Sequence, residues 1–370
     1  MTNNYLLPSS SIVADERIEK LVGQSSQDSN FAVDGNEDGV KLIEDIKAKS
    51  KQNSKIDLWH AAKRIDHQLA KKERPVLDFL FPGFRMGRVG GLVSAGGIGK
   101  SMLALELAVA VACPLKEANL LGIDTPKHGR VLYLSGEDDI EEFQNRLHSI
   151  HKVLELSGKG DEIVEYLERN LEIIDLEDSP RDFLDPQVFE KFSEWAKGCR
   201  LIIIDTLSMF HSADENSNTE MAKVVARFKL IAKRYGCCLL FLHHTSKSMA
   251  IDGRQDEQQS TRGASVLVDN ARFICYLAGM SKQEYGRLKG ENGGSMPFPE
   301  SERKKWVSFG ASKQNGGGHF DPFWLTRAEG GVLVRKDSKF GGVRGSDYIE
   351  PAPKPAVKVK KKQSIQRDYV

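Results

Sequence analysis

Residues 94–101, Ser-Ala-Gly-Gly-Ile-Gly-Lys-Ser, have the composition and spacing of a loop that binds nucleotide phosphates. They lie between an apolar run over 89–93, which predicts a strand, and an apolar run over 102–112, which predicts a helix. Glycines let the backbone turn several N–H groups toward phosphate oxygens, and the N-terminus of the helix adds positive potential. We therefore expect Lys100 to reach the β- and γ-phosphates of ATP and Ser101 to bind Mg²⁺.

One position departs from the usual pattern G-x-x-x-x-G-K-[ST], because Ser94 stands where the first glycine is expected. A glycine-rich turn before a core helix is the structural alternative for the segment. The flanking strand and helix favour the phosphate loop. The residues predicted to contact the nucleotide are Ser94, Ala95, Gly96, Gly97, Ile98, Gly99, Lys100, Ser101 and Met102.

Two further predicted strands lead to carboxylates. The apolar run Leu201–Ile204 ends at Asp205, and the run 131–134 leads through Ser-Gly to Glu137. Because the carboxyl ends of parallel strands open onto one crevice, we expect Asp205 to support Mg²⁺ and Glu137 to activate the attacking water. Thr206, and not a second acid, follows Asp205. Alternatively, Glu137 and the two aspartates after it only stabilise the N-terminus of the next helix.

A strand predicted over Cys238–Leu242 leads to His243 and His244. Adjacent residues on an extended segment point to opposite sides, so one histidine faces the core and the other faces the site, where it can sense the γ-phosphate. Farther along, Arg262 and Arg272 are candidates to neutralise charge that develops in phosphoryl transfer, even across a subunit interface. An ordinary ion pair is the alternative for either arginine.

Two polar segments, 208–218 and 246–261, lack apolar periodicity and are candidate loops for contact with DNA. Lys247 and Arg254 offer positive charge there, but nearby acidic residues oppose it. On composition alone, these loops are about as consistent with contact with DNA as with a purely structural role.

From residue 74 to about 336, strand and helix patterns alternate, which predicts an α/β fold with a mainly parallel sheet flanked by helices. One amphipathic helix carries Ile140, Phe143, Leu147, Ile150 and Leu154. A second begins after Asp185 and stops at Gly198, and a third ends at Gly236. Shorter strands over 273–277, 306–312 and 332–334 suggest an antiparallel extension at the C-terminal end.

The 370-residue chain has a net charge of +1, so any binding of nucleic acid must come from local patches. Its five cysteines form no C-x-x-C pair, which favours a reducing cytoplasm and argues against a zinc site. No apolar run approaches the ~20 residues that cross a bilayer, and no secretory leader is evident, so we expect no membrane association.

Three segments are predicted. Residues 1–73 form an N-terminal extension, polar over its first half, with short apolar stripes at 40–46 and 58–69 that predict helices docked on their own domain or on a neighbouring subunit. Residues 74–340 form the nucleotide-binding domain. Residues 341–370 form a disordered basic tail, with six basic residues and one acidic residue over 351–370. The tail serves either solubility or contact with DNA phosphates.

Four segments together resemble a RecA-like P-loop NTPase core: 94–101, Tyr133–Asp138, Leu201–Leu207 and Phe241–Lys247. The segment Ser260–Arg272, Ser-Thr-Arg-Gly-Ala-Ser-Val-Leu-Val-Asp-Asn-Ala-Arg, narrows the likeness to the RepA-type hexameric replicative helicases of IncQ-type plasmids. The resemblance covers roughly residues 75–335, and the serine at position 94 agrees with it.

The resemblance implies a homohexameric ring that hydrolyses ATP at subunit interfaces and moves 5′ to 3′ along single-stranded DNA. It assigns Glu137 as the base, Asp205 to the metal, His244 to phosphate sensing and Arg272 as the arginine finger. It also places Arg146 near the nucleotide. A primase and an origin-binding initiator are candidate partners. The alternative is a RecA-fold regulatory or recombination ATPase that does not unwind DNA.

Overall fold

The computed structural model describes residues 65–244, 265–291, 298–315 and 317–336. The chain divides into two units, Met1–Arg74 and Pro75–Val370. In the first unit the described part holds a 3₁₀ turn, η1 (His67–Lys71), in which Asp66 caps the N-terminus by accepting from the N–H of Gln68. The stripe predicted at 40–46, most of the one at 58–69 and the basic tail lie outside the described residues.

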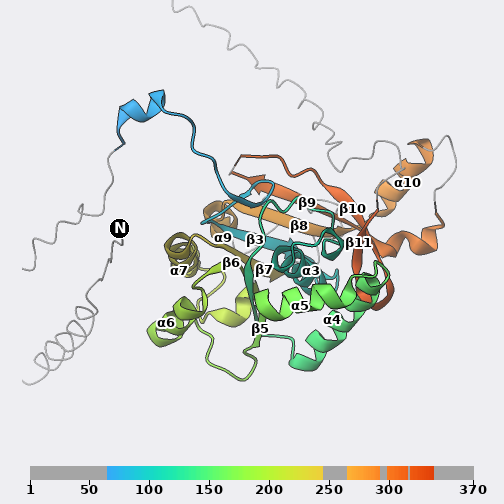
Figure 1. Cartoon of the computed structure of the whole chain (residues 1–370), viewed down its shortest axis with the longest axis horizontal. Coiled ribbons are helices and arrows are strands. Elements are labelled where there is room, and N and C mark those ends of the chain that lie inside the picture. Colours follow the sequence, from blue (N-terminus) through green and yellow to red (C-terminus); the bar gives the residue numbers. More distant parts are fainter. Residues whose placement is uncertain (1–64, 245–264, 292–297, 316, 337–370) are drawn as a thin grey trace, which may run out of the picture. The chain divides into compact units, whose positions relative to one another are not determined.

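The second unit is built on a nine-stranded sheet with the order β11-β10-β9-β8-β3-β7-β6-β4-β5 (Figure 1). The strands from β8 to β5 run parallel. They are β8 (Phe273–Gly279), β3 (Val89–Ser94), β7 (Cys238–His244), β6 (Cys199–Asp205), β4 (Arg130–Ser135) and β5 (Leu171–Asp175). The order β8-β3-β7-β6-β4, with the phosphate-loop strand β3 beside β7, is that of a RecA-like core and confirms the predicted fold class.

The antiparallel extension consists of β9 (Trp306–Gln314), β10 (Phe323–Arg327) and β11 (Leu333–Arg335). We expected β8 to begin this extension. Instead β8 is the strand at which the sheet changes direction, because it pairs parallel with β3 and antiparallel with β9. A separate hairpin, β1 (Phe79–Phe81) with β2 (Phe84–Arg85), was not predicted, since two such short strands carry no periodicity.

Helices cover both faces of the sheet. On one face α3 (Lys100–Ala112), α4 (Ile140–Glu155) and α5 (Gly160–Asn170) share a core with residues of β3, β4, β6 and β7. On the other face α6 (Pro186–Trp195), α7 (Asn218–Tyr235) and α9 (Ser265–Asn270) pack on the alternate residues of the same strands. Helix α10 (Lys282–Glu291) packs beside the extension. In the described ranges no helix is long and apolar enough to cross a bilayer.

The predicted helix ends are largely reproduced. Asp185 caps α6 by accepting from two backbone N–H groups, and Gly236 ends α7 in the left-handed conformation. Two expectations were wrong. Helix α6 ends at Trp195 rather than at Gly198. Ile140, expected in the buried stripe of α4, is 59% exposed, because it is the first residue of the helix.

A buried carboxyl joins α3 to the end of the extension. Glu106 is 2% exposed, its Oε1 accepts from the N–H of Leu333 at 2.6 Å, and its Oε2 has no hydrogen-bond partner. Burial raises the pKa of Glu106 well above its usual value. The folded chain therefore holds a proton on Glu106 over a pH range in which the unfolded chain has lost it.

We expect Glu106→Gln to remove a pH dependence of stability. A group whose pKa is raised by folding stabilises the fold below its unfolded pKa, and that contribution is lost as pH rises toward the folded pKa. Relative to the variant, the wild-type free energy of unfolding should fall as pH rises above about 4.5, by at most about 1.4 kcal/mol per pH unit. Urea titrations at pH 5, 6 and 7 measure this difference. A difference that stays constant with pH would show that Glu106 is ionised in the fold.

Candidate nucleotide-binding site

The predicted phosphate loop connects the carboxyl end of β3 to the first turn of α3, as the sequence indicates. Gly97 and Gly99 adopt φ angles of 75° and 93°, which L-residues rarely adopt. The Ser94 hydroxyl donates to the carbonyl of Ala95 at 2.7 Å, so the serine in place of the first glycine is buried and satisfied. Lys100 begins α3, and Ser101 and Met102 follow it in the first turn.

Arg327 of β10 supports the loop from the side. Its Nη2 donates to the carbonyl of Ile98 at 2.7 Å, and a Cβ added to Gly99 would meet its Nη1 at 2.9 Å. A side chain at position 99 would therefore displace this arginine as well as strain the backbone. Arg327 was not among the predicted site residues, because it lies 227 positions after Lys100 on a strand of the extension.

Lys100 and Asp205 form a buried pair at the carboxyl ends of β3 and β6. The Lys100 Nζ lies 4.0 Å from the Asp205 Oδ1, and the two residues are 5% and 1% exposed. Burial lowers the pKa of Lys100, while the charges of Asp205 and Glu137 oppose that shift. Burial raises the pKa of Asp205, while Lys100 and a hydrogen bond from Tyr133 oppose it. The Tyr133 hydroxyl donates to the Asp205 Oδ2 at 2.6 Å.

The donor set fits a Mg²⁺ ion. The Asp205 Oδ1 is buried and has no hydrogen-bond partner, and the hydroxyl of Ser101 lies close enough to the carboxylate to lower its pKa. Mg²⁺ is held in such sites by one or two protein oxygens, with phosphate oxygens and waters completing the shell. Ser101 and Asp205 would hold the ion, which would neutralise phosphate charge when bound.

Glu137 lies beyond the end of β4, within reach of both neighbouring strand ends. Its Oε1 accepts from the Thr206 hydroxyl at 2.6 Å, and its Oε2 lies 3.9 Å from the His244 Nε2. Its side chain is 42% exposed, so water reaches the carboxylate. The helix-stabilising alternative applies to Asp139 instead, which caps α4 by accepting from the N–H of Glu142. Glu137 is therefore not the N-cap residue of α4, and its carboxylate is open to solvent.

The two histidines separate as adjacent strand residues should. His243 is 6% exposed, and burial lowers its pKa to about 4. The His244 side chain is 45% exposed and faces Glu137, and a Cβ added to Gly96 would lie 3.9 Å from its Nδ1. Burial, then the charge of Lys100, lowers the pKa of His244, so the ring is neutral at pH 7. A neutral imidazole can both donate and accept hydrogen bonds beside the loop.

Arg146 projects from α4 toward the same end of the sheet. Its Nη1 donates to the Asp138 Oδ2 at 2.6 Å, and its Nη2 lies 3.5 Å from the Glu142 Oε2. Its positive charge adds to the lowering of the pKa of Lys100, which burial causes first, and opposes the raised pKa of Tyr133.

Arg272 lies at the other end of the sheet. Its N–H donates to the carbonyl of Val89, the first residue of β3, whereas the loop leaves β3 after Ser94. Five residues of strand separate the two ends by about 16 Å. Arg272 is therefore not brought together with Lys100, Glu137 and His244 within one chain. Arg262, Lys247 and Arg254 lie outside the described residues.

Thr206 donates a hydrogen bond to Glu137 and was not among the predicted site residues. We expect Thr206→Val, which keeps the shape and removes the hydroxyl, to lower kcat for ATP hydrolysis about tenfold, because Glu137 loses the hydrogen bond that orients it. Thr206→Ser should restore activity to within about twofold. Steady-state kinetics of the two variants measure the difference. Equal loss in both variants would assign the effect to packing.

A family model described as an AAA domain matches residues 60–250, just over half of the chain. The chain belongs to this AAA domain family. The matched range contains the loop 94–101, Glu137, Asp205 and both histidines.

Solved structures with similar folds include an ATPase domain, a helicase and a recombinase. The ATPase domain matches this AAA domain chain with a TM-score of 0.49 at 16% identity, over 82% of this chain and 100% of its own. A DnaB-like replicative helicase, studied with its interactions with primase, matches with a TM-score of 0.49 at 16% identity. The match covers 88% of this chain and 71% of the helicase chain. The RadB recombinase matches with a TM-score of 0.41 at 14% identity, over 68% of this chain and 90% of the recombinase chain. The strand order of the sheet, rather than these likenesses, defines the fold.

Proposed function

We propose that the chain is a Mg²⁺-dependent ATP hydrolase that works as a ring-shaped replicative DNA helicase on single-stranded DNA. One observation carries the proposal: the groups that fit phosphate, metal and water lie at the carboxyl ends of the parallel strands, whereas Arg272 lies at the amino end. An arginine placed there reaches a phosphate only on another copy of the chain. In this proposal the site is complete only in an assembly.

In this proposal each group of the cluster has one task. Lys100 and the backbone of 94–101 hold the phosphates, and Ser101 and Asp205 hold Mg²⁺. Glu137, oriented by Thr206, accepts the proton of the attacking water. Neutral His244, beside both Glu137 and the loop, registers the γ-phosphate, and Arg146, paired with Asp138, adds positive charge near the nucleotide.

The surroundings of Arg272 support a role toward an anion. Arg85, Arg88 and Arg272 line a polar cavity of about 200 Å³ together with Asn315. Among the described residues no carboxylate pairs with any of these three arginines. Burial, then the charge of Arg272, lowers the pKa of Lys229, a sign of crowded positive charge. Arginines that no described carboxylate pairs with, at the amino ends of β3 and β8, suit the triphosphate of a neighbouring subunit.

The finer features of the proposal rest on the motif resemblance. They are a homohexameric ring, movement from 5′ to 3′, a cytoplasmic role in plasmid or mobile-element replication, and a primase and an initiator as partners. From the same resemblance we also propose that the chain is divided into an N-terminal extension, an ATPase domain and a basic tail.

The first test is ATP hydrolysis by the purified full chain, with and without single-stranded DNA, together with its native mass in the same buffer. Stimulation by DNA in a ring-sized particle is expected, and strand displacement on a 5′-tailed duplex should follow. Hydrolysis that DNA does not stimulate, in a monomer or dimer, would favour a regulatory ATPase instead.

Binding to single-stranded DNA should weaken with salt. Each phosphate contact releases condensed counterions, so the logarithm of the affinity should fall against the logarithm of the salt concentration with a slope of about −0.7 per contact. Fluorescence anisotropy of a labelled oligothymidylate over a range of salt concentrations measures the slope. A salt-independent affinity would count against a motor that moves along the DNA backbone.

A further inference from the structure

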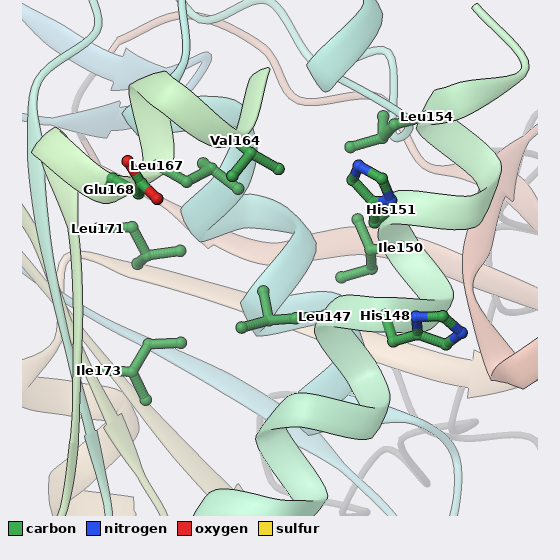
Figure 2. Close-up of a pocket in the computed structure, with 10 residues that line it drawn as sticks. All are labelled: Leu147, His148, Ile150, His151, Leu154, Val164, Leu167, Glu168, Leu171 and Ile173. Atoms are coloured by element: carbon green, nitrogen blue, oxygen red, sulfur yellow. The ribbon is translucent and has the colours of Figure 1, made fainter. Parts of the chain in front are cut away.

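An apolar groove lies between α4 and α5, where neither helix fully covers the sheet. It has a volume of about 380 Å³. Its apolar lining includes Leu147 and Leu154 of α4, Val164 and Leu167 of α5, and Leu171 and Ile173 of β5 (Figure 2). This volume is in the range of about 300–1,000 Å³ that suits a small ligand or a few inserted side chains.

The groove is separate from the nucleotide cluster. Its α4 residues begin one position after Arg146 and continue away from the loop, and its floor is the edge strand β5. Val164 is 37% exposed, and the lining holds none of the groups that surround Lys100. Open apolar surface of this kind is unfavourable in water and marks a place where another apolar group binds.

The side of the groove formed by α5 is acidic, whereas α4 contributes His148 and His151 to the lining. Glu168 lines the groove, and α5 carries three acidic residues besides Glu168 against the single Arg169, which already lies 3.4 Å from Glu165. Asp161 of α5 is fully exposed and lies 3.9 Å from the His151 Nε2. An occupant of the groove should therefore combine small apolar side chains with positive charge.

The chain itself contains a segment of this chemistry. Residues 351–370 hold six basic residues and one acid, and valines alternate with lysines over 357–360. Alternation puts the two valines on one side of an extended segment and the lysines on the other. The segment can thus present apolar side chains to the groove and ammonium groups to its rim.

The end of the described chain lies within reach. The turn η5 (Glu329–Gly331) packs against α4 at Ser149, and the N–H of Arg335 donates to the carbonyl of Leu120. The 34 residues that follow Lys336 span up to about 110 Å when extended, compared with a radius of gyration of about 20 Å for a domain of this size. Length does not limit access to the groove.

We propose that the groove between α4 and α5 is a docking site for the basic segment 351–370 of the same chain. Valine side chains of the segment fill the apolar floor, and its lysines lie against the acidic residues of α5. This inference is independent of the proposed helicase activity, since it uses no residue of the nucleotide cluster.

Photo-crosslinking in the full-length protein tests the proposal. A benzoylphenylalanine replaces Val164 in the groove, and a control replaces Leu230, which is 44% exposed on α7 over the opposite face of the sheet. An equal mixture of ¹⁵N-labelled and unlabelled chains is irradiated and digested. Peptides from 351–370 should be joined to the groove site at least about fivefold more than to the control site, with both halves carrying the same isotope.

Three results would overturn the proposal: equal yields at both sites, crosslinks from the groove to other segments only, or crosslinks that join labelled to unlabelled chains. The last result would assign the groove to a second copy of the chain.

A charge reversal in the groove provides an independent test of the docking proposal. Glu168→Lys should lower the crosslink yield about two- to fivefold, the effect of losing one exposed ionic contact. Glu190→Lys, an exposed reversal on α6, should leave the yield unchanged. Circular dichroism melts confirm that both variants are folded. An unchanged yield in Glu168→Lys would contradict the role given to the acidic rim.

Discussion

Lys100→Ala is expected to reduce ATP hydrolysis to the rate seen without protein, at least about 10³-fold below the wild type. Lys100 begins α3 and, among the described residues, is the one cation paired with the buried Asp205 carboxylate. In a site of low water content such a charge acts on developing phosphate charge with little reorganisation, so its loss removes several kcal/mol of transition-state stabilisation. Retained hydrolysis in pure variant would contradict the assignment of the loop.

The same substitution has a structural effect that must be separated from the catalytic one. Removing Lys100 leaves the Asp205 carboxylate buried without its counter-ion, which typically costs about 3–5 kcal/mol. A Lys100→Ala, Asp205→Asn double variant removes both charges and should recover much of the stability while remaining inactive. Lys191→Ala, at an exposed lysine of α6, is the matched control and should behave as wild type in both assays.

Arg272→Ala is expected to lower kcat for hydrolysis by about 10³–10⁵, the range that arginines supplied across an interface contribute. Nucleotide affinity and native mass should stay close to the wild type, because Arg272 touches neither the loop nor the buried pair of its own chain. Arg287→Ala, at an exposed arginine of α10, is the matched control. Hydrolysis kinetics, equilibrium titration with nucleotide and native mass spectrometry measure the three quantities.

Mixing variants tests whether Arg272 acts on a neighbour. Glu137→Gln lacks the base but keeps its arginine, and Arg272→Ala lacks the arginine but keeps its base. An interface in which Glu137→Gln supplies the arginine to an Arg272→Ala subunit holds both groups, so mixed rings should regain part of the activity. No recovery at any mixing ratio would refute a role across the interface.

The parts of the fold that could be predicted are those with continuous periodicity. Strands β3, β6 and β7 and helix α7 lie close to their expected bounds, because uninterrupted apolar runs and a terminal glycine define them. Helix α5 was missed. It begins at Gly160 without a side-chain cap, and its acidic residues obscure a narrow apolar stripe. The groove beside it could not be predicted, since it depends on how two helices leave β5 uncovered.

The same distinction holds for the site. Side chains that directly follow a strand could be predicted to converge, because the carboxyl ends of parallel strands meet at one edge of the sheet. The contacts that orient these side chains could not be predicted from the sequence. Tyr133 reaches Asp205 across 72 positions, and Thr206 reaches Glu137 across 69, and both depend on the register that sets Ser135 opposite Asp205.

The place of β3 in the sheet also governs how the chain is made. Both of its neighbours, β7 and β8, come later in the sequence, and β8 ends 185 residues after β3 does, at 279 against 94. At a synthesis rate of about 5–20 residues per second, β3 waits roughly 10–40 s until both of its neighbours have been made. During that interval the nascent chain presents an unpaired apolar strand, which makes it a substrate for chaperones before it can bind any nucleotide.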